Sequence, residues 1–392
     1  ASSFIGKYFK LENSGVPNAR NTQFTTELRA GLSTFVTMAY IISVNALITT
    51  ESDLCVNDPD YLSCKTIVQR DLITATAAVS CIATAIMGIF ANLPLALAPG
   101  MGINAYFTYA VVGFHGSGKI AYETAVAAVF VEGLVFLFLS VFGICQLFAK
   151  LIPMSIKIAT GAGIGFFLAF IGLQRSAGIA LISNNPSTVV TLGGCPDQYY
   201  NKTTGICTSH HMENPTTWLG ILDKYWEIVL HRDDGNARFN FFKNVVGFHV
   251  IENPDVWLVL ITSLYVDILD TTGTFYSMAK FGSYLNEAGN FEGSNAAFIS
   301  SASSISIGAI FGTSSVITVI ESGSGIAEGG RTGITSLTVS FFFFISLFFA
   351  PIFVSIPPWA SGPVLIITGS MMAKSTKDIN WKYIGDSVPS FL

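Results

Sequence analysis

The chain has 392 residues, of which 51% are hydrophobic and only 11% are charged, with a formal net charge of −5. Soluble domains carry about 25% charged residues, so this composition predicts a protein embedded in a lipid bilayer. The small net charge and the lack of a dense basic cluster exclude a nucleic-acid partner. The sequence contains no phosphate-binding loop, nucleophile–histidine–acid set or metal-ligand spacing, so we expect no enzymatic activity, cofactor or metal.

Ten apolar runs are candidates for crossing a bilayer. In chain order they cover residues 28–49, 72–93, 96–114, 123–148, 154–175, 257–279, 296–312, 314–328, 333–354 and 359–373. The expected fold is therefore an all-α polytopic membrane protein. The third and eighth runs are short and interrupted by glycine, which predicts an extended segment followed by a half-helix in each.

The first break lies in Ala98-Pro-Gly-Met-Gly-Ile-Asn-Ala-Tyr-Phe107. Paired breaks in two halves of a membrane chain indicate a transporter's substrate site. Gly100 and Gly102 would let a flat ligand approach the backbone, and Asn104 offers both donors and an acceptor. Phe107 is a candidate for stacking on a base, although such rings more often serve packing. The alternative is that the glycines serve helix packing and Asn104 caps a helix.

Three acidic residues within the apolar runs are the main functional candidates, because ionised side chains are energetically unfavourable in lipid. A charged side chain at the bilayer centre costs at least about 2.5–3.5 kcal/mol, which makes it a functional candidate. Asp267 and Asp270 share one helical face, while Glu321, followed by Ser322, lies in the second break, Gly312–Gly333. We expect Glu321 and Asp267 to face the ligand, with Ser322 beside them, and any of the three acids to hold a proton. The alternative is that one acid is structural.

Two polar loops carry cysteine pairs, Cys55 with Cys64 and Cys195 with Cys207. Both pairs suit disulfides if the loops face an oxidising compartment. Asn201 starts an N-glycosylation pattern within the second pair. Lysine and arginine are concentrated in the other connections, so the positive-inside rule places the N-terminus in the cytoplasm and both cysteine loops outside. We expect a multi-pass protein of the plasma membrane.

Several long motifs occur in a characteristic order. They are Glu27–Asn45, Ala98–Phe107, Leu264–Thr274, Glu321–Gly333 and Ser355–Trp359. Together they resemble the AzgA-like purine permeases of the nucleobase–ascorbate (nucleobase cation symporter 2) superfamily. The resemblance implies an inverted-repeat transporter of fourteen spans, in which spans three and ten are broken. It also implies that Asn104, Asp267 and Glu321 bind a purine.

The resemblance further implies a division into core and gate domains. After a cytoplasmic segment 1–26, residues 27–150 would form the first core repeat, and 151–187 gate span five. Spans six and seven would be degenerate within an outside loop, 188–256. Residues 257–354 would form the second core repeat, and 355–392 would hold span twelve before a truncated end, without spans thirteen and fourteen.

The resulting functional hypothesis is proton-coupled import of adenine, guanine or hypoxanthine. Expected partners are the purine, protons, the lipid bilayer and, through the gate domain, a second copy of the chain. Three alternatives remain open at this point. They are an inorganic-anion carrier of the same fold, which three acids disfavour; an aspartyl protease built on Asp267, for which no second aspartate appears in a glycine-rich part of another span; and a non-transporting fragment.

Overall fold

The computed structural model describes most of the chain as helix. The described residues are 4–12, 20–50, 52, 54–55, 61–113, 117–118, 120–145, 147, 153–173, 179, 181–182, 254–284, 291–350, 353 and 358–391. The Cys195–Cys207 pair and Asn201 lie outside these residues, so both remain predictions.

In the first half of the chain, long helices precede and follow one broken element, which consists of a short strand and a short helix. A short helix, α1 (Phe4–Tyr8), precedes α2 (Phe24–Met38) and α3 (Tyr40–Thr49), which are nearly continuous. Helix α4 (Tyr61–Ile86) ends in a π-helical turn, Met87–Ala91. The broken element is strand β1 (Leu97–Pro99), helix α5 (Met101–Tyr106) and a π-helical turn, Phe107–Val111. Helices α6 (Tyr122–Val141) and α8 (Met154–Leu173) complete this half.

The second half repeats the same order. Helices α10 (Pro254–Phe281) and α11 (Ser294–Ile310) precede strand β2 (Val316–Thr318) and helix α12 (Ser322–Ala327). Helices α13 (Gly333–Phe348) and α15 (Pro358–Ala373) follow, and a 3₁₀ turn (Lys374–Asp378) leads to α16 (Ile384–Phe391). Each of the ten predicted runs contains a helix, and both predicted breaks contain a strand followed by a short helix.

Several helices have the length and composition of membrane spans. Within the described residues, four are long and apolar enough to cross a bilayer: Phe24–Thr49, Ile67–Ala91, Tyr122–Val141 and Pro254–Phe281. Gly161–Leu173 and Gly333–Phe348 are shorter apolar helices. These helices confirm the expectation of a helical membrane protein.

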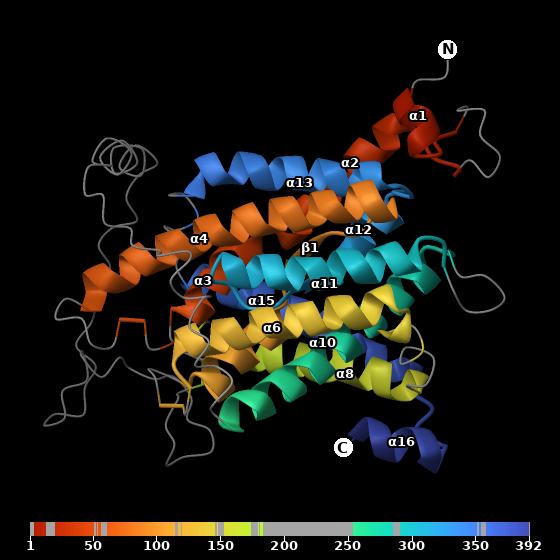
Figure 1. Cartoon of the computed structure of the whole chain (residues 1–392). Helices are drawn as coiled ribbons and strands as arrows, with labels where there is room; N and C mark the ends of the chain where they lie inside the picture. The colour runs from red at the N-terminus through yellow and green to blue at the C-terminus, as the bar shows by residue number, and fades with distance from the viewer. Residues whose placement is uncertain are drawn as a thin grey trace, which may run out of the picture.

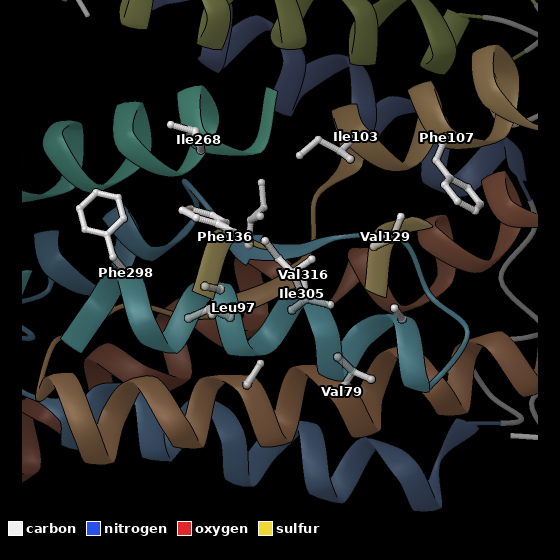
Figure 2. Close-up of a cluster of buried hydrophobic side chains, with 14 of the residues drawn as sticks. Val79, Leu97, Ile103, Phe107, Val129, Phe136, Ile268, Phe298, Ile305 and Val316 are labelled. Carbon is white, nitrogen blue, oxygen red and sulfur yellow. The ribbon is translucent and has the colours of Figure 1, made fainter. Parts of the chain in front are cut away.

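The two halves are interleaved, since helices of one half pack on helices of the other. In Figure 1, α13 lies along α4, followed by α11, α6 and α10, with β1 near the centre. Apolar side chains from both halves meet between them, including Val79 of α4, Leu97 of β1, Phe136 of α6 and Ile305 of α11 (Figure 2). The two breaks are thus enclosed by helices of both halves.

Glu27, on α2, ties the two halves together through one buried carboxylate. Its Oε1 accepts the backbone N–H of Arg331 at 2.8 Å, and its Oε2 accepts those of Thr332 and Thr335 at 3.2 Å. The Thr335 hydroxyl donates to Oε2 at 2.6 Å. The carboxylate therefore satisfies backbone donors at the start of α13, where a helix end favours a negative charge.

Replacing Glu27 with alanine should lower the stability of the folded protein. The substitution would leave several buried N–H groups without an acceptor, and each such group costs about 1–3 kcal/mol. We expect a clearly lower midpoint of thermal unfolding in detergent, measured by loss of the monodisperse chromatographic peak. Glu12→Ala, at an exposed site, should leave the midpoint close to wild type; equal midpoints for both variants would contradict the anchoring role.

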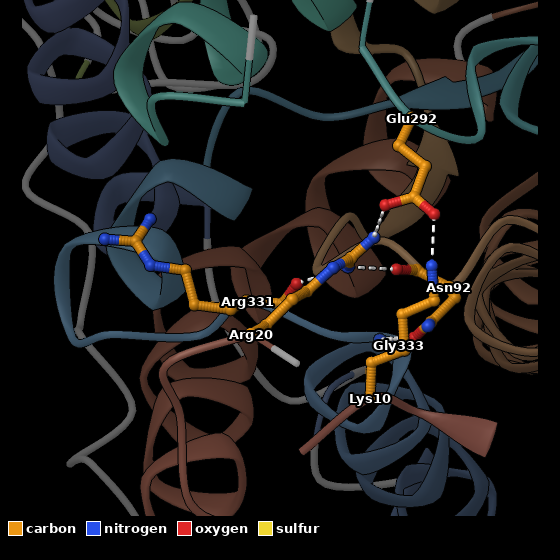
Figure 3. A network of polar contacts seen from close by, with 6 residues as sticks. All are labelled: Lys10, Arg20, Asn92, Glu292, Arg331 and Gly333. Carbon is orange, nitrogen blue, oxygen red and sulfur yellow. Dashed lines mark hydrogen bonds and ion pairs between the residues drawn. The ribbon is translucent and has the colours of Figure 1, made fainter. Parts of the chain in front are cut away.

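A second polar network joins the N-terminal segment to the same end of the fold (Figure 3). Arg20 donates to the carbonyl oxygens of Asn92 at 2.6 Å and Arg331 at 2.5 Å. Glu292 pairs with Lys10 and lies 3.6 Å from Arg20. The hydrogen bond from Lys10 holds the pKa of the Glu292 carboxyl below its usual range. Lys10, Arg20 and Arg331, three of the basic residues predicted to lie in the cytoplasm, therefore lie close together.

At the opposite end of α4, a disulfide joins Cys55 to Cys64, which confirms one of the two predicted bridges. The substitution Cys55→Ser should free the Cys64 thiol. If the N-terminus is cytoplasmic, a membrane-impermeant maleimide added to intact cells should label this variant but not the wild type. Labelling only after permeabilisation would reverse the predicted orientation.

Candidate functional site

The two broken segments lie side by side. Strands β1 and β2 pair antiparallel, with Leu97 opposite Thr318, Ala98 opposite Ile317 and Pro99 opposite Val316. The pairing extends beyond the strands through hydrogen bonds from Gly100 N to Ser315 O and from Val319 N to Ala96 O. Each strand leads into its own short helix, so α5 and α12 start from one shared crossing.

Side chains satisfy the irregular backbone at this crossing, as an apolar interior requires. The Thr84 hydroxyl of α4 both accepts from Leu97 N and donates to Leu97 O, each at 3.0 Å. The Ser322 hydroxyl accepts from Ala96 N at 2.9 Å. Ser336 of α13 donates to the carbonyls of Leu93 and Leu95. The extended segment before α5 is therefore held by side chains of α4, α12 and α13.

Helix α3 connects the polar residues of both breaks. Asn104 donates to the carbonyl of Asn45 at 3.2 Å and accepts from the Thr49 hydroxyl at 3.0 Å. Tyr40, at the start of α3, donates to Glu321 Oε1 at 2.6 Å. Tyr40 and Asn45 are five residues apart, or about 7.5 Å along a helix axis. Asn104 and Glu321 are thus held by neighbouring turns of one helix.

The predicted acids differ in their accessibility. Glu321 and Asp270 are both partly exposed, whereas Asp267 is fully enclosed. Asp270 accepts a 3.3 Å hydrogen bond from Thr274 and lies within electrostatic range of both Glu321 and Asp267. Asp267 faces Glu132 of α6 instead of open space. The geometry therefore favours Glu321 and Asp270 as the acids that a ligand reaches.

The remaining predicted residues have mainly packing environments. The Phe107 ring is 3% exposed and packs edge-on against Tyr122, with centroids 5.5 Å apart. Ser322 is fully buried and its hydroxyl already binds Ala96. A Cβ atom at Gly100 would approach Ile317 Cδ1 to 2.8 Å, so this glycine permits the close strand crossing. Gly102 is partly exposed.

Two polar residues of this region, Tyr40 and Glu132, were not among the candidate site residues predicted from the sequence. Glu132 lies in the middle of the apolar run 123–148, so the energetic argument that selected Asp267 applied to it equally. Tyr40 carries no comparable pattern, because tyrosine is common in apolar helices and its hydroxyl partner becomes evident only after the helices pack.

Comparisons with known proteins identify relatives along the whole chain. A family model described as "Permease family" matches residues 25–193. The efflux pump notK' of Aspergillus versicolor is 48% identical, with 100% of this chain and 78% of that protein aligned. The guanine/hypoxanthine permease PbuO of Bacillus subtilis is 32% identical (95% and 86% covered). The adenine permease AdeQ of Escherichia coli is 31% identical (100% and 85% covered).

The fold also has a solved counterpart. The transmembrane domain of the cyanobacterial bicarbonate transporter BicA superposes with a TM-score of 0.55 at 12% identity, covering 93% of this chain and 94% of that one. At this identity the likeness concerns the fold alone. The family to which the chain belongs follows from the relatives identified by sequence. The chain therefore belongs to the nucleobase–ascorbate transporter family of membrane permeases, which are transporters and not enzymes.

Proposed function

We propose that the protein transports purine bases, namely adenine, guanine and hypoxanthine, across the plasma membrane together with protons. The main support for this proposal is the position of two partly exposed acidic residues, Glu321 and Asp270, where the broken segments cross. A carboxylate accepts N–H groups, and a purine edge presents N–H groups next to ring nitrogens. Relatives named as guanine/hypoxanthine and adenine permeases support this substrate class.

The charge at the crossing disfavours an inorganic anion as substrate. Helices α3, α5 and α12 contain no lysine or arginine, while the nearby acids repel a negative ion. A neutral base avoids that repulsion and can still donate to Glu321 and Asp270. We therefore favour purine transport over transport of an inorganic anion, although the bicarbonate transporter BicA shares the fold.

Export is the second candidate function, since one relative is named as an efflux pump. Both directions use the same site and differ only in the gradient that drives the cycle. The test uses cells without endogenous purine uptake that produce this protein. Import predicts faster entry of labelled hypoxanthine, which a protonophore abolishes, whereas export predicts faster loss from preloaded cells.

Two further outcomes are informative. Binding of purine by the purified protein without movement in either direction would favour the non-transporting alternative. Neither binding nor movement of any purine, with the protein present at the cell surface, would overturn the proposed function.

A further inference from the structure

A buried pair of carboxyl groups lies beside the candidate site. Glu132 of α6 and Asp267 of α10 are both 0% exposed, and their carboxyl groups face each other within hydrogen-bonding reach. None of their four oxygen atoms meets a donor in regular hydrogen-bond geometry. An ionised carboxylate can only accept hydrogen bonds, so two of them face to face leave both unsatisfied.

Within α6, α10, α11 and β2, no basic side chain lies beside this pair. In α6, α10, α11 and β2 the only basic residue is Lys280, which is exposed at the end of α10. Two further acids lie nearby. Asp270, one helical turn from Asp267, interacts electrostatically with Asp267, and Glu321 interacts electrostatically with Asp270. Two buried charges of like sign cannot both persist without compensation. A proton shared by the two carboxyl groups removes one charge and supplies the missing donor.

A serine hydroxyl group also faces the Asp267 carboxyl group. The Ser315 hydroxyl, at the start of the β2 segment, is fully buried, faces Asp267 and has no other partner. It can donate to the carboxyl oxygen that remains an acceptor when the shared proton is present. The buried region between α6, α10 and β2 thus contains the groups needed to hold one proton.

We infer that Glu132 and Asp267 together hold one proton, and that this pair is the proton-binding site coupled to the ligand site of α10 and α12. The inference rests on the proposed function for the identity of the ligand, and it adds Glu132 to the acids selected from sequence. Proton loss would add a negative charge next to Asp270 and Glu321. Because that charge opposes their ionisation, purine affinity should fall as pH rises through the range in which the pair releases its proton.

The test compares wild-type protein with Glu132→Gln in hypoxanthine-binding calorimetry, repeated over pH and in buffers of different ionisation enthalpy. Glutamine cannot exchange a proton, and its amide can donate permanently to Asp267. We expect the variant to bind hypoxanthine, to lose the fall in affinity at high pH, and to take up no proton on binding where the wild type takes up a fraction of one. The matched control is Glu123→Gln, an exposed glutamate on the same helix, which should behave as wild type.

The outcomes separate this inference from the proposed function. A Glu132→Gln variant that binds purine with unchanged pH dependence and proton uptake would overturn the shared-proton pair and leave purine transport intact. A wild type that binds no purine would instead overturn the proposed function. A uniform loss of affinity at every pH in Glu132→Gln would assign Glu132 a structural role only and would also reject the pair.

A second measurement applies even if the variant does not fold. Difference infrared spectroscopy of wild-type protein during a pH titration should detect the C=O stretch of a protonated carboxylic acid at neutral pH, and this band should vanish at higher pH. The absence of any such band at neutral pH would reject the shared proton.

Discussion

Glu321→Gln should weaken hypoxanthine binding by roughly ten- to a hundredfold. The substitution keeps the shape of the side chain and one acceptor oxygen but removes the negative charge, and a hydrogen bond to a charged group contributes about 1.5–3 kcal/mol. The new amide group also places N–H donors where the Tyr40 hydroxyl now donates to Oε1. Isothermal titration of purified protein measures the change, and surface labelling in cells checks that the variant is still produced.

Glu328→Gln is the matched control for this effect. Glu328 lies seven residues further along, at the other end of α12, where it is exposed and pairs with Arg29 at 3.1 Å. Exposed ion pairs contribute about 0–1 kcal/mol, so this variant should bind hypoxanthine almost as wild type does. Equal affinities for wild type, Glu321→Gln and Glu328→Gln would remove Glu321 from the site.

Gly333→Ala should prevent the protein from reaching a stable folded state. Gly333 begins α13, and a Cβ atom there would lie 2.0 Å from the carbonyl oxygen of Gly88, in the π-helical turn that follows α4. Its N–H also donates to Asn92 Oδ1 at 2.8 Å, which fixes its position. Since the obstacle is backbone and not a flexible side chain, α13 and the π-helical turn Met87–Ala91 would have to separate, and overpacking of this kind costs about 1–3 kcal/mol or more. We expect little monodisperse protein after detergent extraction.

Gly161→Ala provides the comparison for Gly333→Ala. A Cβ atom at Gly161 meets no heavy atom within 4 Å, so alanine fits there, and the gain in helix propensity should be neutral or slightly stabilising. Monodisperse Gly333→Ala protein in wild-type yield would mean that the contact between α13 and the turn Met87–Ala91 is looser than the structure has it.

The breaks were predictable from sequence because their cause is local. Pro99, Gly100 and Gly102 interrupt an apolar run that otherwise reads as helix, and Gly312 with Thr313 does the same in the second half. Lipid forbids unpaired backbone, so two such interruptions must find partners inside the protein, and each is the natural partner of the other. The sequence did not predict that the two segments pair as antiparallel strands, or that Ala98 lies opposite Ile317; both became evident from the structure.

The partners of the acids were not predictable in the same way. Asp267 stands out in the sequence as an acid in an apolar run, but whether it meets a ligand, Glu132 or a serine depends on how α6 and α10 cross. The same holds for Glu27, whose role as an anchor for α13 links residues more than 300 positions apart. Local patterns identify costly residues, and tertiary packing decides what compensates each cost.

A structure of the protein with hypoxanthine bound tests the central claim most directly, because it shows where the base lies. We predict density for the base at the β1–β2 crossing, with ring N–H groups about 2.7–3.1 Å from the carboxyl oxygens of Glu321 or Asp270, and with Asp267 still facing Glu132. A base bound elsewhere, with Glu321 and Asp270 out of its reach, would contradict the account.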